Sequence, residues 1–304
     1  MTKDTKPDPV AKTHGELINT LKERGLGIEC ETITLDTLQH IDYFRIKGYY
    51  LHLQQKDCAE FVPGTSFRQV VALHNFDSNL RLLLLALLFD IEIDARARIA
   101  YSVGHAWGAL GYRDVGNYHE RNRDDITRLL ASIDQNLERS KEFLVRKYRK
   151  EHKSDFPVWI AVEAMSFGDL SKLFSLLPTS QKKFIANTYE SLDEELLGSW
   201  LHAAAVLRNI CAHNCRIYNR HMPIPIVIEK VIKDKASAIC PRFMIYPTSL
   251  FAYMLSIRRM SNSNSWDLFV RSFICLTENY TEYIQMVQMG FPFEWRDILL
   301  EMKR

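Results

Sequence analysis

A long helical pattern from Phe67 to about Ala106 limits the fold of this chain more than any other feature. The segment Pro63-Gly64-Thr65-Ser66 predicts a turn with a helix N-cap directly before it. The middle of the pattern, residues 80–93, reads LRLLLLALLFDIEI and is apolar on nearly all sides, which is typical of a buried helix. The run is shorter than the roughly 20 residues that a membrane-spanning helix needs, and it carries charged residues. We therefore expect a central core helix and no membrane-spanning segment.

The rest of the chain also favours helices over strands. Glycine and proline are scarce, at 12 and 10 residues, and a composition of 47% hydrophobic and 25% charged residues is typical of globular proteins. Further helices are predicted over 14–27, from Thr34 with a break at Gly48, over 121–153, over 157–177, from a cap at Ser191 or Asp193 to the prolines of 222–228, and within 246–304. The helix over 121–153 is expected to bury Ile126, Leu129, Leu130, Ile133, Leu137, Phe143 and Leu144. With no internal repeat or linker, we expect a disordered tail (1–13) and one compact all-α domain (14–304).

Charge and cysteine content indicate the environment of the protein. The net charge is +2, which neither requires nor excludes a nucleic-acid partner. The six cysteines contain no CxxC pair, and the first residues are polar, so we expect a cytoplasmic protein with reduced thiols. Cys211, His213 and Cys215 form a CxHxC pattern, but the two cysteines fall on an apolar helix face and no second ligand pair is evident. We expect no metal and no cofactor.

Five blocks of the sequence, in order along the chain, resemble one known family. They are LKERGLGIECETITLDTLQHIDYFRIKGYYLHL, LHNFDSNLRLLLLALLFDIEIDARARIAYSVGHAWGALGY, FPVWIAVEAMSFGDLSKLFSLL, SWLHAAAVLRNICAHNCRIYNR and MGFPFEW. Together they resemble the Abi-like abortive-infection family, which includes AbiD and AbiF proteins, over about residues 17–296. The resemblance implies an all-helical fold, a role in phage defence and a HEPN-like helical core.

HEPN proteins are often metal-independent ribonucleases that act as dimers, and they carry an arginine followed by a histidine after four to six residues. A polar residue often follows the arginine. The matching residues here are Arg208, Asn209 and His213, within a HEPN-like motif in residues 193–221. The spacing by itself is weak evidence, because six other pairs fit it: Arg45/His52, Arg68/His74, Arg98/His105, Arg113/His119, Arg146/His152 and Arg216/His221. The asparagine and the family resemblance single out Arg208.

Helical geometry divides this segment into two faces. One face is apolar and should enter the core: Leu197, Trp200, Leu201, Ala204, Leu207, Cys211 and Cys215. Asn209, His213, Arg216 and Arg220 share a different, polar face toward which His202 also projects.

Arg208 lies at the edge of the apolar face, about 140° from His213 on an ideal helix. The helix could be distorted, Arg208 could be buried and structural, or two subunits could combine their faces; we prefer the third arrangement. A buried Arg208 would need a partner such as Glu92, Asp94 or Glu163.

These residue types suit RNA cleavage that uses the 2′-hydroxyl as the nucleophile. Histidine is the side chain most often used for proton transfer, so His213 can act as base or acid. Arg208 or Arg216 could hold the phosphate, and Asn209 could orient the imidazole or contact the sugar. We therefore hypothesise a metal-independent endoribonuclease. The simpler interpretation is a solvated histidine beside an arginine on a helix surface.

Two other groups of residues are candidate RNA contacts. The first is the basic segment 139–153, with Arg146, Lys147, Arg149 and Lys150; the alternative is a solvated helix end. The second is Arg98 with His105, seven residues apart on the long helix, for which a structural role is the simpler interpretation.

The partner that we expect is RNA, which could be a structured noncoding RNA encoded nearby, as beside some AbiF-like relatives. A homodimer is also expected. The alternative functions are a non-catalytic binder of such an RNA and a helical scaffold for another protein.

Overall fold

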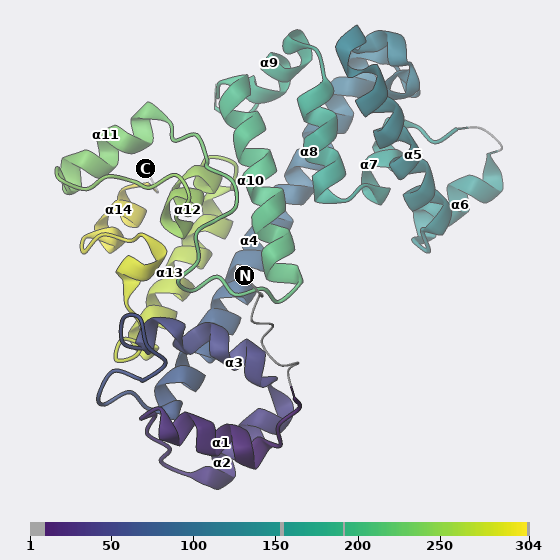
Figure 1. Ribbon diagram of the computed structural model, residues 1–304. Coiled ribbons are helices and arrows are strands. Elements are labelled where there is room, and N and C mark those ends of the chain that lie inside the picture. The colour runs from purple at the N-terminus through teal and green to yellow at the C-terminus, as the bar shows by residue number, and fades with distance from the viewer. Residues whose placement is uncertain (1–9, 153–154, 191, 303–304) are drawn as a thin grey trace, which may run out of the picture. The chain divides into compact units, whose positions relative to one another are not determined.

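The computed structural model describes residues 10–152, 155–190 and 192–302 (Figure 1). Within these ranges the chain forms fourteen α-helices, short 3-10 helices and no β-strand, which confirms the all-α prediction. Residues 1–9 of the predicted tail, Lys153 and the alternative cap Ser191 lie outside the described residues. The chain divides into two compact units: one holds residues up to Asn79 with Leu276–Ile284, and the other holds Leu80–Cys275 with the residues from Gln285 onwards.

The first unit contains the N-terminal helices. They are α1 (His14–Glu23), α2 (Glu31–His40), α3 (Tyr43–Tyr50) and the 3-10 helix η1 (Leu51–Leu53). The predicted break at Gly48 is wrong, because this glycine lies inside α3. The chain instead breaks at Ile41, which is extended, and the Asp42 side chain then accepts hydrogen bonds from the Phe44 and Arg45 N–H groups and starts a new helix.

The long helix predicted from Phe67 to about Ala106 is confirmed as α4 (Phe67–Trp107). Ser66 accepts a hydrogen bond from the Gln69 N–H at 3.3 Å, as the predicted N-cap requires. In the second unit one side of α4 is buried, including Leu84, Leu88 and Ile91. The side that carries Phe89 and Ile93 is exposed, so α4 is not covered on all sides as expected for a central core helix.

The remaining helices belong to the second unit, apart from the end of α13. They are α5 (Arg123–Arg139), α6 (Phe143–Glu151), α7 (Val158–Ala164), α8 (Phe167–Leu176), α9 (Thr179–Asn187), α10 (Glu194–Ala212), α11 (Lys230–Ile239), α12 (Leu250–Arg258), α13 (Ser263–Asn279) and α14 (Trp295–Glu301). Four 3-10 helices join them: η2 (Gly111–Arg113), η3 (Val115–Asn117), η4 (Glu120–Asn122) and η5 (Met286–Met289).

Two segments predicted as single helices are each divided in two. Between α5 and α6 the extended Ser140 ends the first helix, and Glu142 caps the second. The new helix therefore has its own orientation, and Phe143 and Leu144 are exposed rather than buried as predicted. Between α7 and α8, Ser166 and Asp169 form a reciprocal capping box that begins a new helix.

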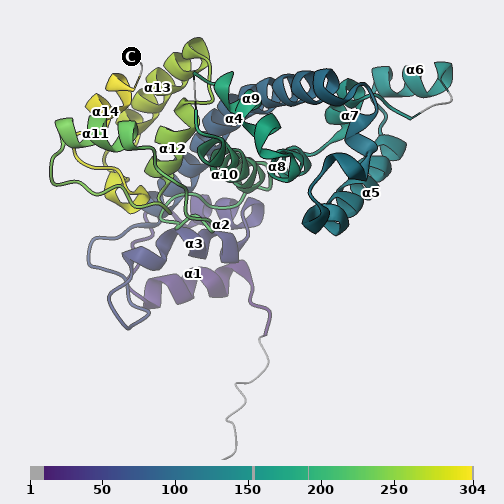
Figure 2. The same cartoon turned by 90° about the horizontal axis from the view of Figure 1, so that it is seen from above.

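Helix α10 lies at the centre of the second unit, beside α8, α9 and α12 (Figures 1 and 2). Its predicted apolar face is buried from Leu197 to Cys211, and the Trp200 indole N–H donates to the Val227 carbonyl at 2.7 Å. Cys215, expected on that face, is exposed because the helix has already ended. No helix within the described ranges has both the length and the apolar character needed to cross a membrane.

Candidate functional site

The C-terminal end of α10 determines which predicted site residues lie together. The helix ends at Ala212, and Asn214 has a left-handed backbone with φ of 55°. The Cys215 N–H donates to the Ile210 carbonyl at 2.9 Å, and the Asn214 N–H donates to the Cys211 carbonyl at 3.1 Å. This is a Schellman motif, in which asparagine takes the position that glycine usually occupies. The predicted polar face with i, i+4, i+7 and i+11 spacing is therefore wrong beyond His213.

The two arginines that follow the turn contact the loop. Arg216 Nη1 donates to the carbonyls of Tyr218 and Asn219 at 2.8 and 3.0 Å, and Arg220 Nη1 donates to the Arg216 carbonyl at 3.3 Å. Both side chains are half-buried. These contacts stabilise the loop. The structure does not align the two guanidinium groups with His213 on one helix face.

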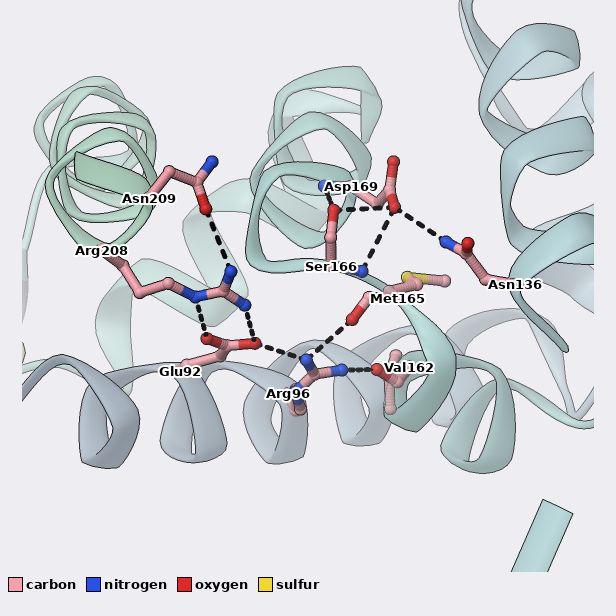
Figure 3. A network of polar contacts seen from close by, with 9 residues as sticks. All are labelled: Glu92, Arg96, Asn136, Val162, Met165, Ser166, Asp169, Arg208 and Asn209. Carbon is pink, nitrogen blue, oxygen red and sulfur yellow. Dashed lines mark hydrogen bonds and ion pairs between the residues drawn. The ribbon is translucent and has the colours of Figure 1, made fainter. Parts of the chain in front are cut away.

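Arg208 forms a bidentate ion pair with Glu92 of α4, as Figure 3 shows. Its Nε lies 3.0 Å from Glu92 Oε2, and its Nη2 lies 3.1 Å from Glu92 Oε1. Glu92 also accepts from Arg96, which donates to the Val162 and Met165 carbonyls as well. The Glu92 side chain is only 8% exposed, and those of Arg96 and Arg208 are 11% and 22% exposed. One carboxylate thus compensates two largely buried cations.

The third nitrogen of the Arg208 guanidinium orients Asn209. Arg208 Nη1 donates to Asn209 Oδ1 at 3.0 Å. Because a guanidinium can only donate, the amide must present its oxygen to Arg208 and its NH₂ group away from it (Figure 3). The chain Glu92–Arg208–Asn209 therefore fixes an N–H donor on the exposed face of α10.

His213 is the C-cap residue of α10, and its side chain is exposed. Its backbone N–H still donates to the Asn209 carbonyl at 2.9 Å, so the two residues are one helical turn apart. Residues at this spacing are neighbours on a helix surface. The structure thus brings the oriented amide of Asn209 and the imidazole of His213 to the same exposed end of α10.

Comparison with known families shows to which family the chain is related. The profile of a family described as Abi-like protein matches residues 36–219, which is more than half of the chain and includes all of α10. The chain belongs to the Abi-like family. No curated protein and no solved structure matches it. Membership in this family suggests a role in abortive infection, a defence against phage.

Arg98 and His105 of this Abi-like protein have different surroundings. Arg98 pairs with Asp94 at 2.7 Å, donates to the Thr188 carbonyl and lies 4.2 Å from the centre of the Tyr189 ring. The desolvated Arg98 guanidinium has a raised pKa because the hydrogen bond and charge of Asp94 outweigh its burial. His105 is exposed, its ring is tilted against that of Tyr101 with the ring centres 4.0 Å apart, and it lines a different hollow from Arg98. The structure does not combine them into one site.

The predicted basic segment of the Abi-like protein forms α6 and its flanks. Arg146, Lys147 and Lys150 are exposed, while Arg149 donates to the Leu137 carbonyl and lies 5.9 Å from the centre of the Phe156 ring. The exposed apolar side chains of Phe143 and Leu144 precede these cations on the same short helix. Exposed apolar and basic side chains therefore occur together on α6.

Sequence reasoning missed two features of this region. Arg96 shares Glu92 with Arg208, although nothing in the sequence distinguishes it from its basic neighbours. Arg121 and Lys182 line a hollow that also reaches Asn209 and His202. The only sequence signal for this hollow was the position of His202 on the polar face of α10.

Proposed function

We propose that this Abi-like protein is an abortive-infection effector that binds RNA and cleaves it at the end of α10 without a metal, with a HEPN-like core as its scaffold. The observation that carries the proposal is that the exposed His213 follows the preset amide of Asn209 by one helical turn. A side chain that can act as base or acid thus lies one helical turn from a fixed hydrogen-bond donor.

The proposed reaction is an internal transfer within the RNA strand. A base removes the proton of the 2′-hydroxyl, the 2′-oxygen forms a bond to phosphorus, and the bond from phosphorus to the 5′-oxygen breaks. The 5′-oxygen then takes up a proton from an acid. His213 supplies one of these proton transfers, and the Asn209 NH₂ group contacts the phosphate or sugar. Arg208 acts as a positioning residue, because Glu92 and Asn209 already engage all three of its nitrogens.

The basic helix α6 is the second part of the proposal, as a contact for the RNA backbone. Reversing the charge of Arg146, Lys147 and Lys150 to glutamate is expected to lower RNA affinity and flatten its dependence on salt, since each phosphate contact contributes about 0.7–0.9 to the slope. The measurement is fluorescence anisotropy of a labelled RNA over a range of salt concentrations.

The matched control reverses three exposed lysines elsewhere, Lys56, Lys230 and Lys233. An unchanged salt slope in the α6 variant would remove α6 from the RNA-binding surface. Wild-type protein that binds no RNA at any salt concentration would contradict the proposed function as a whole.

We also propose that the protein is a homodimer that joins through the exposed face of α4. Phe89, Ile93, Tyr101 and the nearby Trp159 are 49–65% exposed, and all but Phe89 line an apolar groove of about 500 Å³. Four large side chains that are about half exposed offer on the order of 400 Å² of accessible surface for burial in an interface. This is about half of the ~800 Å² per partner in a standard interface. Residues around these four side chains would supply the remaining interface area.

Ile93→Glu is expected to convert the dimer into a monomer, because the interface would bury an unpaired charge. Leu268→Glu, on the exposed face of α13, is the matched control and should leave the dimer intact. Sedimentation equilibrium measures the oligomeric state of each variant. A monomeric wild type at micromolar concentration would contradict the dimer, and a dimeric Ile93→Glu would exclude this face.

A further inference from the structure

A hollow of about 820 Å³ lies between α8, α9 and α10 in the second unit. Its walls combine polar and apolar groups, and the polar ones include hydroxyl groups from Ser171, Ser175, Thr179 and Ser199 and side chains from His202 and Asn209. Gly168 on α8 and Gly198 on α10 also line it, so no side chain from these positions fills the space. Its size is within the range of small-molecule sites.

Three cations line the hollow, and they differ in their partners. Lys172 pairs with Asp125 at 2.8 Å, and this bond together with Arg128 lowers the pKa of the Asp125 carboxyl. Lys182 on α9 and Arg121 on η4 instead lie close enough for their two positive charges to repel each other. Burial lowers the pKa of Lys182, the positive charge of Arg121 lowers it further, and Glu194 partly opposes the shift. Two like charges that face one space favour an anion between them.

Two acidic residues, Glu194 and Glu195, also line the hollow. Glu194 lies 3.7 Å from Lys183, a lysine outside the lining, and Glu195 is exposed. The α10 wall continues from Gly198 through His202 to Asn209, which is about 16 Å along a helix. The hollow is therefore longer than a single phosphate requires, and it ends at the amide that Arg208 orients.

We infer that this hollow binds one ribonucleotide of an RNA strand, with its phosphate between Arg121 and Lys182 and its sugar and base along the wall formed by His202. The inference rests on the proposed RNA binding and names the entry path of that RNA. The strand then runs along α10 toward Asn209 and His213, so the nucleotide held in the hollow fixes which phosphodiester bond reaches the imidazole.

The test measures the salt dependence of affinity for a labelled ten-nucleotide single-stranded RNA. Arg121→Ala/Lys182→Ala is expected to lower affinity about tenfold at low salt and to reduce the salt slope by about 1.4, because two contacts to single-stranded RNA are lost. Arg121→Ala alone, an exposed position, should reduce the slope by about 0.7. Arg121→Lys/Lys182→Arg keeps both charges and should retain the wild-type slope.

The matched control is Arg123→Ala/Lys233→Ala, which removes the same charges at two exposed positions outside the hollow. RNA binding with an unchanged slope in both Arg121→Ala and Arg121→Ala/Lys182→Ala would overturn this inference and leave the proposed function intact. A wild type that binds no RNA would overturn both. An equal loss of slope in the matched control would also overturn the inference, because the effect would then come from net charge.

Discussion

His213→Ala is expected to lower the rate of RNA cleavage by about 10²–10⁴-fold, the contribution that a positioned acid or base usually makes. The exposed imidazole makes no contribution to the core, so the variant should fold as the wild type does and should keep its RNA affinity. Single-turnover cleavage of a labelled RNA measures the rate, and circular dichroism during heating checks the fold.

The matched control is His40→Ala, another exposed histidine near a helix C-terminus, which should cleave at the wild-type rate. Cleavage by His213→Ala at the wild-type rate would contradict the proposed chemistry. RNA that is bound but left uncut by both wild type and His213→Ala would instead support the non-catalytic RNA binder. Sequencing of the RNA that co-purifies would then show whether it is one structured noncoding RNA.

Glu92→Ala is expected to lower the free energy of unfolding by about 3 kcal/mol or more, because it leaves two largely buried cations without their carboxylate. Asp94→Ala on the same helix is the matched control. Its ion pair with Arg98 is about one-third exposed on both sides, so the loss should be about 1 kcal/mol or less. Urea denaturation measures both variants.

A second measurement separates the ion pair from general damage to α4. A double-mutant cycle of Glu92→Ala with Arg208→Ala should give a coupling energy of about 1–3 kcal/mol, as expected for groups in one network. Additive effects, or equal losses for Glu92→Ala and Asp94→Ala, would contradict the structural role of the network. Slower RNA cleavage by Arg208→Ala with unchanged RNA affinity would support its role in orienting Asn209.

The elements that could be predicted from the sequence are those determined by local rules. The apolar pattern of α4, its start after Ser66 and the buried face of α10 follow from periodicity and capping. The early end of α10 was missed because asparagine is a weaker stop signal than glycine. The exposed apolar residues of α6 were missed because a single extended residue, Ser140, reoriented the helix.

The sequence by itself determined an all-helical chain, a resemblance to the Abi-like family and a candidate motif at Arg208, Asn209 and His213. Only the tertiary structure decided that Arg208 pairs with Glu92 rather than with the neighbouring Asp94, which pairs with Arg98, or with the exposed Glu163. Spacing along one helix sets which side chains share a face. The partner of a largely buried guanidinium depends on which carboxylate the packing of α10 against α4 brings close to it. Glu92 and Arg208 are 116 positions apart in the sequence, so no local pattern indicates that they pair.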